Sequence, residues 1–155
     1  GLRCGYTVIP HELQVQTLDG RSISMNSLWS YRQRIRFNGV SYVTQCAAAA
    51  IYTPEGKVEV CNAINYYMKN VMMMRRELST TGIRLYGGEH VPYLWIRIPH
   101  QHSAWEYFRM MLYGAHVVCT PGIAFGPSGE GYVRLSAFAS RSDCEKAVIQ
   151  LKGWL

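Results

Sequence analysis

The sequence lacks several features that mark specialised classes of protein. Its 155 residues contain no apolar run of the roughly 18 residues that a membrane span needs, and no basic-then-apolar leader opens the chain. Hydrophobic residues make up 48% and charged residues 17%, which is typical of a globular domain able to bury a core. We therefore expect a folded chain without a membrane span, and neither a disordered nor a fibrous one.

Cysteine and histidine are present, but their spacing favours neither a disulfide framework nor a metal site. The five cysteines form no C-x-x-C pair, so we expect reduced thiols, most of them buried. His100 and His102 could ligate a metal, yet no third ligand of matching spacing lies near them in the sequence. No Ser-His-Asp or Cys-His arrangement follows from spacing either. We expect no metal and no complete active site within this chain.

The net charge of +6 leaves a nucleic-acid partner open as one alternative. The basic residues are scattered, however, and no run of Lys and Arg exceeds two residues. A basic interior or interface that serves a small anionic ligand explains the charge equally well. We therefore expect no nucleic-acid partner.

The residues up to 81 predict a strand, a polar turn and three helices. The apolar run "GYTVIP" predicts a strand at 5–10 that is buried on both faces, and Asp19-Gly20 marks a turn within 11–26. Three helices should follow, because three segments with helical periodicity are separated by residues that cap or end a helix. Their expected limits are Asn26 or Ser27 to Asn38-Gly39, Ser41 to Pro54, and Glu55 to Gly82.

From residue 82 the pattern predicts the order strand, strand, helix, strand, strand, helix. The four strands are expected at 83–88, 91–98, 116–120 and 131–138. Two capping boxes, Ser103 to Glu106 and Ser142 to Glu145, should open the two helices. This order predicts a compact α+β domain.

An arginine in the last predicted strand is the strongest candidate for a functional residue. Alternation places Tyr132, Arg134 and Ser136 on one face of that strand, with Val133 and Leu135 on the other. A guanidinium among such neighbours needs an anionic partner, and its planar fork favours a bidentate carboxylate. Three interpretations stay open: an internal salt bridge, an edge position from which the side chain reaches water, and a clamp for a substrate carboxylate.

The glycine-rich stretch before this strand predicts a tight loop. Its glycines stand at positions 122, 126, 129 and 131 around Pro127. The stretch lacks the Gly-Lys-Ser/Thr ending of a phosphate-binding P-loop, and a strand rather than a helix follows it. We expect a tight loop rather than a nucleotide cradle.

Four motifs, in order along the chain, resemble the C-terminal part of LL-diaminopimelate aminotransferases. They are "GLRCGYTVIP", "FNG" at 37–39, "YGGEHVPYLWIRIP" and "PGIAFGPSGEGYVRLSAF". The resemblance implies the fold of fold type I pyridoxal-phosphate aminotransferases. The end of the large cofactor-binding domain would occupy 1–26, the connecting and interface helices 27–81, and the α+β small domain, with a mixed four-stranded sheet, 82–155.

The resemblance also implies roles for three residues. Arg134 resembles the arginine that binds the α-carboxylate of the substrate, and Arg3 resembles the arginine that holds the cofactor phosphate. Asn38 resembles an asparagine that reaches across a dimer interface to the partner's substrate. The Schiff-base lysine of the family would lie upstream of Gly1, so no catalytic residue is expected here. Tyr42 departs from the smaller polar residue expected at its position, which leaves the choice of substrate open.

The function implied is amino-group transfer between LL-diaminopimelate (tetrahydrodipicolinate) and glutamate or 2-oxoglutarate in lysine biosynthesis. The implied partners are pyridoxal 5'-phosphate, amino-acid and 2-oxo-acid substrates and a second copy in a homodimer. The fragment alone would be inactive. The implied compartment is the cytoplasm of a bacterium, or the plastid of a photosynthetic eukaryote. The alternative is a non-catalytic small-molecule-binding or regulatory domain that kept the small-domain fold.

Overall fold

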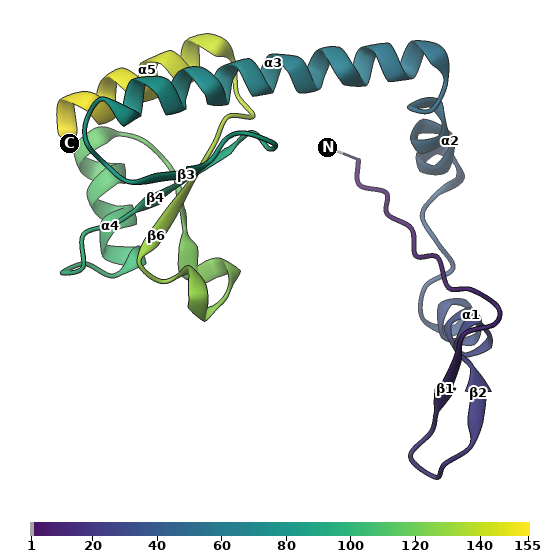
Figure 1. Ribbon diagram of the computed structural model, residues 1–155. Coiled ribbons are helices and arrows are strands. Elements are labelled where there is room, and N and C mark those ends of the chain that lie inside the picture. Colours follow the sequence, from purple (N-terminus) through teal and green to yellow (C-terminus); the bar gives the residue numbers. More distant parts are fainter. Residues whose placement is uncertain (1) are drawn as a thin grey trace. The chain divides into compact units, whose positions relative to one another are not determined.

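The computed structural model describes residues 2–155 (Figure 1). The chain divides into two units, of which the first ends at Glu59 and the second is Val60–Leu155. The long helix α3, Pro54–Ser79, contains this boundary. It confirms the long helix expected between Glu55 and Gly82.

The first unit holds a small hairpin and two helices. Strands β1, Gln14–Gln16, and β2, Ser22–Ser24, pair antiparallel around the predicted turn. Helix α1 is Met25–Arg36 and helix α2 is Tyr42–Ala50. The chain breaks between them at Gly39, whose φ of 106° suits glycine, so this predicted break is confirmed.

The helix caps of the first unit were predicted with mixed success. The Ser41 side chain accepts a hydrogen bond from the Thr44 N–H, so Ser41 is confirmed as the cap of α2. The expected cap of α1 at Asn26 or Ser27 is wrong. Ser24 is the cap and accepts from the Ser27 N–H, because the chain leaves β2 directly into the helix. The Asn26 side chain instead donates to the carbonyl of Ile9.

The buried strand expected at 5–10 is also wrong. This segment forms no strand, and Tyr6 and Val8 are exposed by 84% and 76%. A strand is stabilised by hydrogen bonds to a neighbour, and no strand within residues 2–155 pairs with this segment. The β1–β2 hairpin was missed because its short strands, Gln-Val-Gln and Ser-Ile-Ser, each carry a single apolar residue.

The second unit contains a four-stranded sheet with strand order β3-β4-β6-β5. The strands are β3 Leu85–Gly87, β4 Tyr93–Arg97, β5 Thr120–Pro121 and β6 Tyr132–Ser136. All three pairings are antiparallel, so four strands is right but a mixed sheet is wrong. For β3–β4 and β5–β6 the reason is local, because each pair is joined by a connection too short for the crossover that parallel pairing needs.

Besides α3, the second unit contains helix α4 Ala104–Met110, the π-helical turn Met111–Ala115 and helix α5 Arg141–Trp154. Helices cover one face of the sheet, as Figure 1 shows for α3 and α5. The core joins the inward side chains of the two central strands to the helices. Leu94, Ile96, Val133 and Leu135 on the strands are exposed by 2% or less.

Two boundary predictions in the second unit need correction. The strand expected at 116–120 is limited to Thr120–Pro121, because the π-helical turn ends on His116 in the left-handed conformation, with φ 55°. The capping box at Ser103 and Glu106 is confirmed. The second box is wrong, because the helix begins earlier and Ser140 caps α5 by accepting from the Asp143 N–H.

All five cysteines are free. Cys119 and Cys144 are buried, but Cys4, Cys46 and Cys61 are exposed, so the expectation that most thiols are buried is wrong.

No helix formed by residues 2–155 is long and apolar enough to cross a membrane.

Candidate functional site

Arg134 projects from the face of the sheet that the helices leave open. Tyr132, Arg134 and Ser136 alternate with the buried Val133 and Leu135, as the sequence pattern predicts. The register places Arg134 opposite Trp95 of β4 on one side. On the other side it lies opposite Thr120 of β5. Arg134 therefore lies on β6, one of the two central strands of the sheet, rather than on an edge strand.

The guanidinium of Arg134 lies against two aromatic rings. Its Cζ atom is 4.2 Å from the ring centroid of Tyr93 and 4.2 Å from that of Phe125. A cation over an aromatic face is attracted by the ring quadrupole, and the attraction grows where water is excluded. The aromatic contacts thus provide the stabilisation that an acidic neighbour would otherwise supply.

No acidic residue within 2–155 pairs with Arg134. The six ion pairs of this part of the chain use other cations, and the Arg134 Nε is buried without a hydrogen-bond partner. An internal salt bridge, one of the open interpretations, is therefore excluded within the described residues. A buried donor without an acceptor is costly, so this nitrogen favours an acceptor supplied from outside these residues.

The glycine-rich loop brings Phe125 to this position. It forms two short 3₁₀ turns, Gly122–Phe125 and Pro127–Gly129. A Cβ on Gly122 would lie 2.1 Å from the Gly129 carbonyl oxygen, and a Cβ on Gly129 would lie 2.0 Å from the Gly122 oxygen. Only glycine permits this close approach of two backbones. The loop is thereby compact enough to hold Phe125 over the sheet.

The same loop is attached to helix α4. The Glu130 carboxylate accepts a 2.6 Å hydrogen bond from the backbone N–H of Ala104, the first residue of the helix. The Ser103 hydroxyl and backbone N–H both donate to Glu106, and this lowers the pKa of the Glu106 carboxyl. Both acids therefore serve the start of the helix rather than Arg134.

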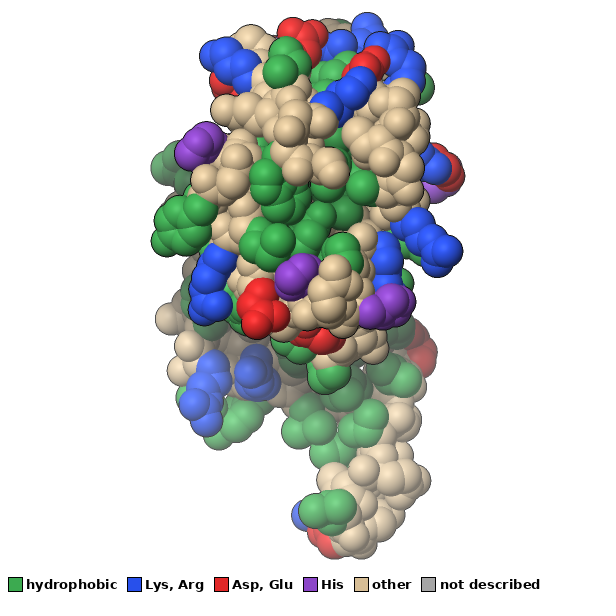
Figure 2. Space-filling view, turned by 90° about the vertical axis from the view of Figure 1, so that its left-hand side faces the viewer, with side chains coloured by type: hydrophobic (Ala, Val, Ile, Leu, Met, Phe, Trp, Pro, Cys, Tyr) green, Lys and Arg blue, Asp and Glu red, His purple; other side chains and the backbone are tan. Residues whose placement is uncertain are grey.

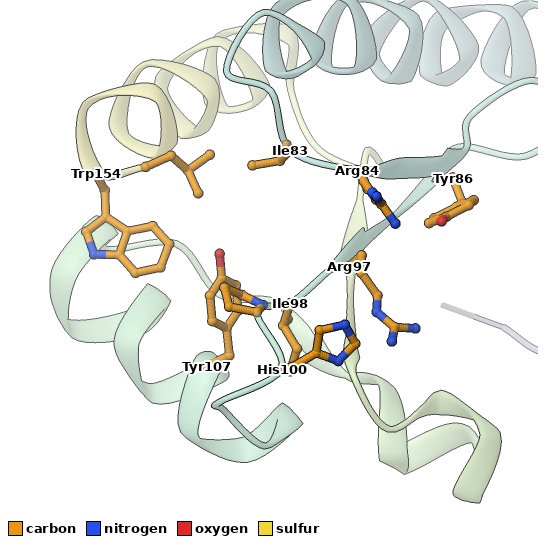
Figure 3. A pocket seen from close by; sticks show the side chains of 10 residues that line it. Ile83, Arg84, Tyr86, Arg97, Ile98, His100, Tyr107 and Trp154 are labelled. Atoms are coloured by element: carbon orange, nitrogen blue, oxygen red, sulfur yellow. The ribbon is translucent and has the colours of Figure 1, made fainter.

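Two further arginines lie on the open face of the sheet. Arg97 donates a 2.8 Å hydrogen bond to the Tyr132 hydroxyl, and its Cζ lies 4.8 Å from that ring. Arg84 and Arg97 line a pocket of about 730 Å³ together with Tyr86, Tyr107 and Trp154 (Figure 3). Arg134 is not among the residues that line this pocket. The aromatic contacts of Arg134 therefore lie outside this pocket.

The other two candidate residues belong to the first unit. Arg3 is exposed and pairs with no acid of residues 2–155. Asn38 is exposed in the connection between α1 and α2, beside Gly39. Tyr42, the position that departs from the expected pattern, is the first residue of α2 and is exposed by 79%. Arg134 belongs to the second unit, so the three candidates are divided between the units.

Sequence reasoning missed Tyr93 and Phe125. The available signal was the alternation of large aromatic residues, Tyr93 and Trp95, in the strand predicted at 91–98. The pairing register was needed to place this row beside Arg134. Phe125 carried no usable signal, because its position depends on the close approach of Gly122 and Gly129.

The two buried thiols, Cys119 and Cys144, are not activated as nucleophiles. Burial raises the pKa of the Cys119 thiol to about 11, and it also raises the pKa of Cys144. Both thiols are therefore protonated at neutral pH. On the face shown in Figure 2, several Lys and Arg side chains gather near the top of the view, with acidic side chains among them.

Comparison with known proteins decides the family. The family described as Aminotransferase class I and II matches residues 1–151. The chain belongs to the class I and II aminotransferases. The chain is 54% identical to an LL-diaminopimelate aminotransferase of Phocaeicola vulgatus over 155 residues, which are all of this chain and 38% of the relative. A Lawsonia intracellularis protein of the same name is 47% identical over 152 residues, 98% of this chain and 37% of the relative.

Solved structures of aminotransferases share the fold of this class I and II family member. L,L-Diaminopimelate aminotransferase from Chlamydomonas reinhardtii matches with a TM-score of 0.82 and 32% identity, over 90% of this chain and 34% of that one. A pyridoxal-phosphate-bound structure from Clostridium difficile matches with a TM-score of 0.70 and 22% identity, over 82% and 33% of the two chains. The expected α+β fold of fold type I aminotransferases is confirmed. The chain spans under two fifths of the length of these curated relatives.

Proposed function

We propose that this chain is the C-terminal part of a pyridoxal-phosphate-dependent aminotransferase. The whole protein would transfer an amino group between LL-diaminopimelate (tetrahydrodipicolinate) and glutamate or 2-oxoglutarate, as in lysine biosynthesis. The observation that carries this proposal is the 54% identity, over all 155 residues, to a protein named for that activity. Because such relatives are bacterial proteins, the cytoplasm of a bacterium is the compartment we propose.

Arg134 is proposed to bind the α-carboxylate of the substrate. It has the required chemistry, since a guanidinium presents parallel N–H donors that match a carboxylate, and no acid of residues 2–155 occupies them. Its buried Nε lacks an acceptor. A bound carboxylate would place a negative charge beside this cation and orient the substrate before reaction.

The residues of the first unit fit the cofactor and a partner subunit. Arg3 is exposed and without an acidic partner in residues 2–155, so its guanidinium is available for a phosphate dianion. Asn38 is exposed beside a tight turn, which suits a side chain that contacts the substrate of the second copy in a homodimer. When bound, pyridoxal phosphate supplies the electron sink for amino-group transfer. The family's cofactor lysine is expected outside these 155 residues, so we propose that this chain alone is inactive.

The test uses the full-length protein loaded with pyridoxal phosphate. LL-diaminopimelate and 2-oxoglutarate should yield glutamate, and Arg134→Ala should lower kcat/KM about 100-fold or more. The matched control is Arg109→Ala, an exposed arginine of α4, which should leave kcat/KM within about twofold. Unchanged kinetics in Arg134→Ala would remove the role given to Arg134. A loaded protein that forms no glutamate from LL-diaminopimelate would favour the non-catalytic binding domain.

A further inference from the structure

We propose that Tyr93 and Phe125 are positioning residues that hold the Arg134 guanidinium ready for a carboxylate. We call this pair of rings the aromatic bracket. In this arrangement the rings replace the acidic partner that a half-buried arginine usually needs. The inference rests on the proposed function of Arg134 and deepens it, because it states what keeps the guanidinium oriented and unpaired.

The first support is that the two rings come from separate elements and reach the same group. Tyr93 begins strand β4, whereas Phe125 ends the 3₁₀ turn of the glycine-rich loop. Each ring centroid lies 4.2 Å from the Arg134 Cζ, well inside the roughly 6 Å reach of a cation–π contact. Two equal contacts to a planar group restrict its rotation more than one would.

The second support is that each ring of the bracket is held by further aromatic residues. Tyr93 packs edge-on against Phe138 at 5.4 Å, and Phe138 lies 4.8 Å from Tyr67 of α3. Phe125 packs edge-on against Trp95 at 5.3 Å. Such edge-to-face pairs favour fixed mutual orientations. The bracket is therefore set by the packing of the second unit rather than by free side-chain rotation.

The third support is chemical. An aspartate or glutamate in place of the rings would pair with the guanidinium N–H donors and would compete with a substrate carboxylate for them. Aromatic faces attract the cation but leave those donors free. No acid of residues 2–155 pairs with the Arg134 guanidinium, and its buried Nε has no hydrogen-bond partner. The bracket thus stabilises the charge without consuming the binding capacity.

The experiment measures carboxylate binding separately from turnover. In the full-length protein loaded with pyridoxal phosphate, the probe is glutarate, a dicarboxylate without an amino group, and its Kd is read from the cofactor absorbance. Phe125→Leu and Tyr93→Leu keep apolar bulk but remove the ring, and each should raise the Kd about tenfold. Phe125→Tyr and Tyr93→Phe keep a ring and should restore the Kd to within about threefold of the unaltered protein.

A matched control distinguishes the effect of the aromatic bracket on glutarate binding from the effect of losing any aromatic ring in the second unit. Phe108→Leu changes another half-buried phenylalanine of the second unit, whose ring packs on Trp105 rather than on Arg134. It should leave the Kd for glutarate unchanged. If Phe108→Leu weakens glutarate binding as much as Phe125→Leu does, the bracket has no special role and the inference is overturned.

A double-mutant cycle tests whether the rings act through Arg134. In an Arg134→Ala background, Phe125→Leu should raise the Kd no further, because the group that it positions is gone. A structural role for Phe125 predicts instead that the two effects add, and that outcome would overturn the inference. The proposed function fails separately: if Arg134→Ala leaves the glutarate Kd unchanged, Arg134 does not bind the carboxylate at all.

Discussion

The two faces of the four-stranded sheet differ in chemistry although their residues alternate along the same strands. On the covered face, Leu94, Ile96, Val133 and Leu135 are almost completely buried against the helices. On the open face, the alternate positions carry aromatic rings and arginines that remain half exposed. The covered face stabilises the unit, and this leaves the open face able to carry an unpaired cation for binding.

The largest expected effect on stability comes from a cavity on the covered face. Leu135→Ala should lower the free energy of unfolding by about 3 kcal/mol, because the fully packed site cannot collapse around the missing methyl groups. Urea unfolding followed by tryptophan fluorescence measures it. Ser136→Ala, one residue along and exposed on the other face, removes only the acceptor of the Phe138 N–H and should lower it by less than about 1 kcal/mol. Equal losses in both variants would contradict the division between the faces.

The alternation that separates these faces was predictable from the sequence, because a strand places successive side chains on opposite sides. Helix limits set by one local residue, such as Ser41, Ser103 and Gly39, were also predictable. The sequence was compatible with a cap at Ser140, since Ser140 and Asp143 have the same spacing as the predicted pair, Ser142 and Glu145. The choice between them depended on where the preceding chain turns into the helix, which packing decides.

The residues around Arg134 were less predictable from the sequence than the side of the sheet on which Arg134 lies. Sequence chemistry correctly required a stabilising partner for the guanidinium, and an internal acid was one open possibility. The partners are the rings of Tyr93 and Phe125, which reach Arg134 through strand register and through the contact of two glycines. Neither the strand register nor the contact between Gly122 and Gly129 produces a recognisable local pattern in the sequence. The strand at 5–10 was wrong for a related reason, because an apolar run does not reveal whether a neighbouring strand is present.

Thiol reactivity should sharpen the comparison between covered and open parts of the chain. Cys119 is buried with a pKa of about 11, against an ordinary value of 9.0, while Cys61 is exposed. At pH 8, a maleimide reagent should modify Cys119 much more slowly than Cys61, because burial keeps the Cys119 thiol protonated and shields it from the reagent. Peptide mass spectrometry over time measures both rates. Equal rates would mean that the core around Cys119 opens readily.

The raised pKa of Cys119 also makes the free energy of unfolding depend on pH. Between pH 9.0 and about 11, the folded state holds the Cys119 proton that the unfolded state has lost. The free energy of unfolding should therefore decrease as the pH rises through this window, and the contribution is fully present below it. Cys119→Ala should show a weaker decrease over the same range. An identical slope in both proteins would assign the effect to other groups.

Gly122→Ala should disturb the open face through the loop. The added Cβ would lie 2.1 Å from the Gly129 carbonyl oxygen and 2.7 Å from that of Tyr132, and neither backbone atom can move freely. We expect a loss of about 2 kcal/mol in the free energy of unfolding. Glutarate binding by the loaded full-length protein should also weaken, because the loop holds Phe125. The control is Gly153→Ala in α5, whose added Cβ meets nothing within 4 Å. If Gly122→Ala binds glutarate normally, the loop does not set the position of Phe125.

The smallest expected effect separates two serines at the start of α5, a helix that covers the buried face. The Ser140 side chain accepts the Asp143 N–H at 3.1 Å, whereas the Ser142 hydroxyl lies 3.0 Å from the Ser140 hydroxyl and caps no backbone group. Ser140→Ala should therefore lower the free energy of unfolding by about 1 kcal/mol, and Ser142→Ala by much less. Urea unfolding of the two variants, measured side by side, checks this. The reverse order would restore Ser142 as the cap and would mean that α5 begins two residues later. Because Cys144, Val148 and Leu151 take their inward positions from that starting point, such a shift would also change how α5 covers the sheet.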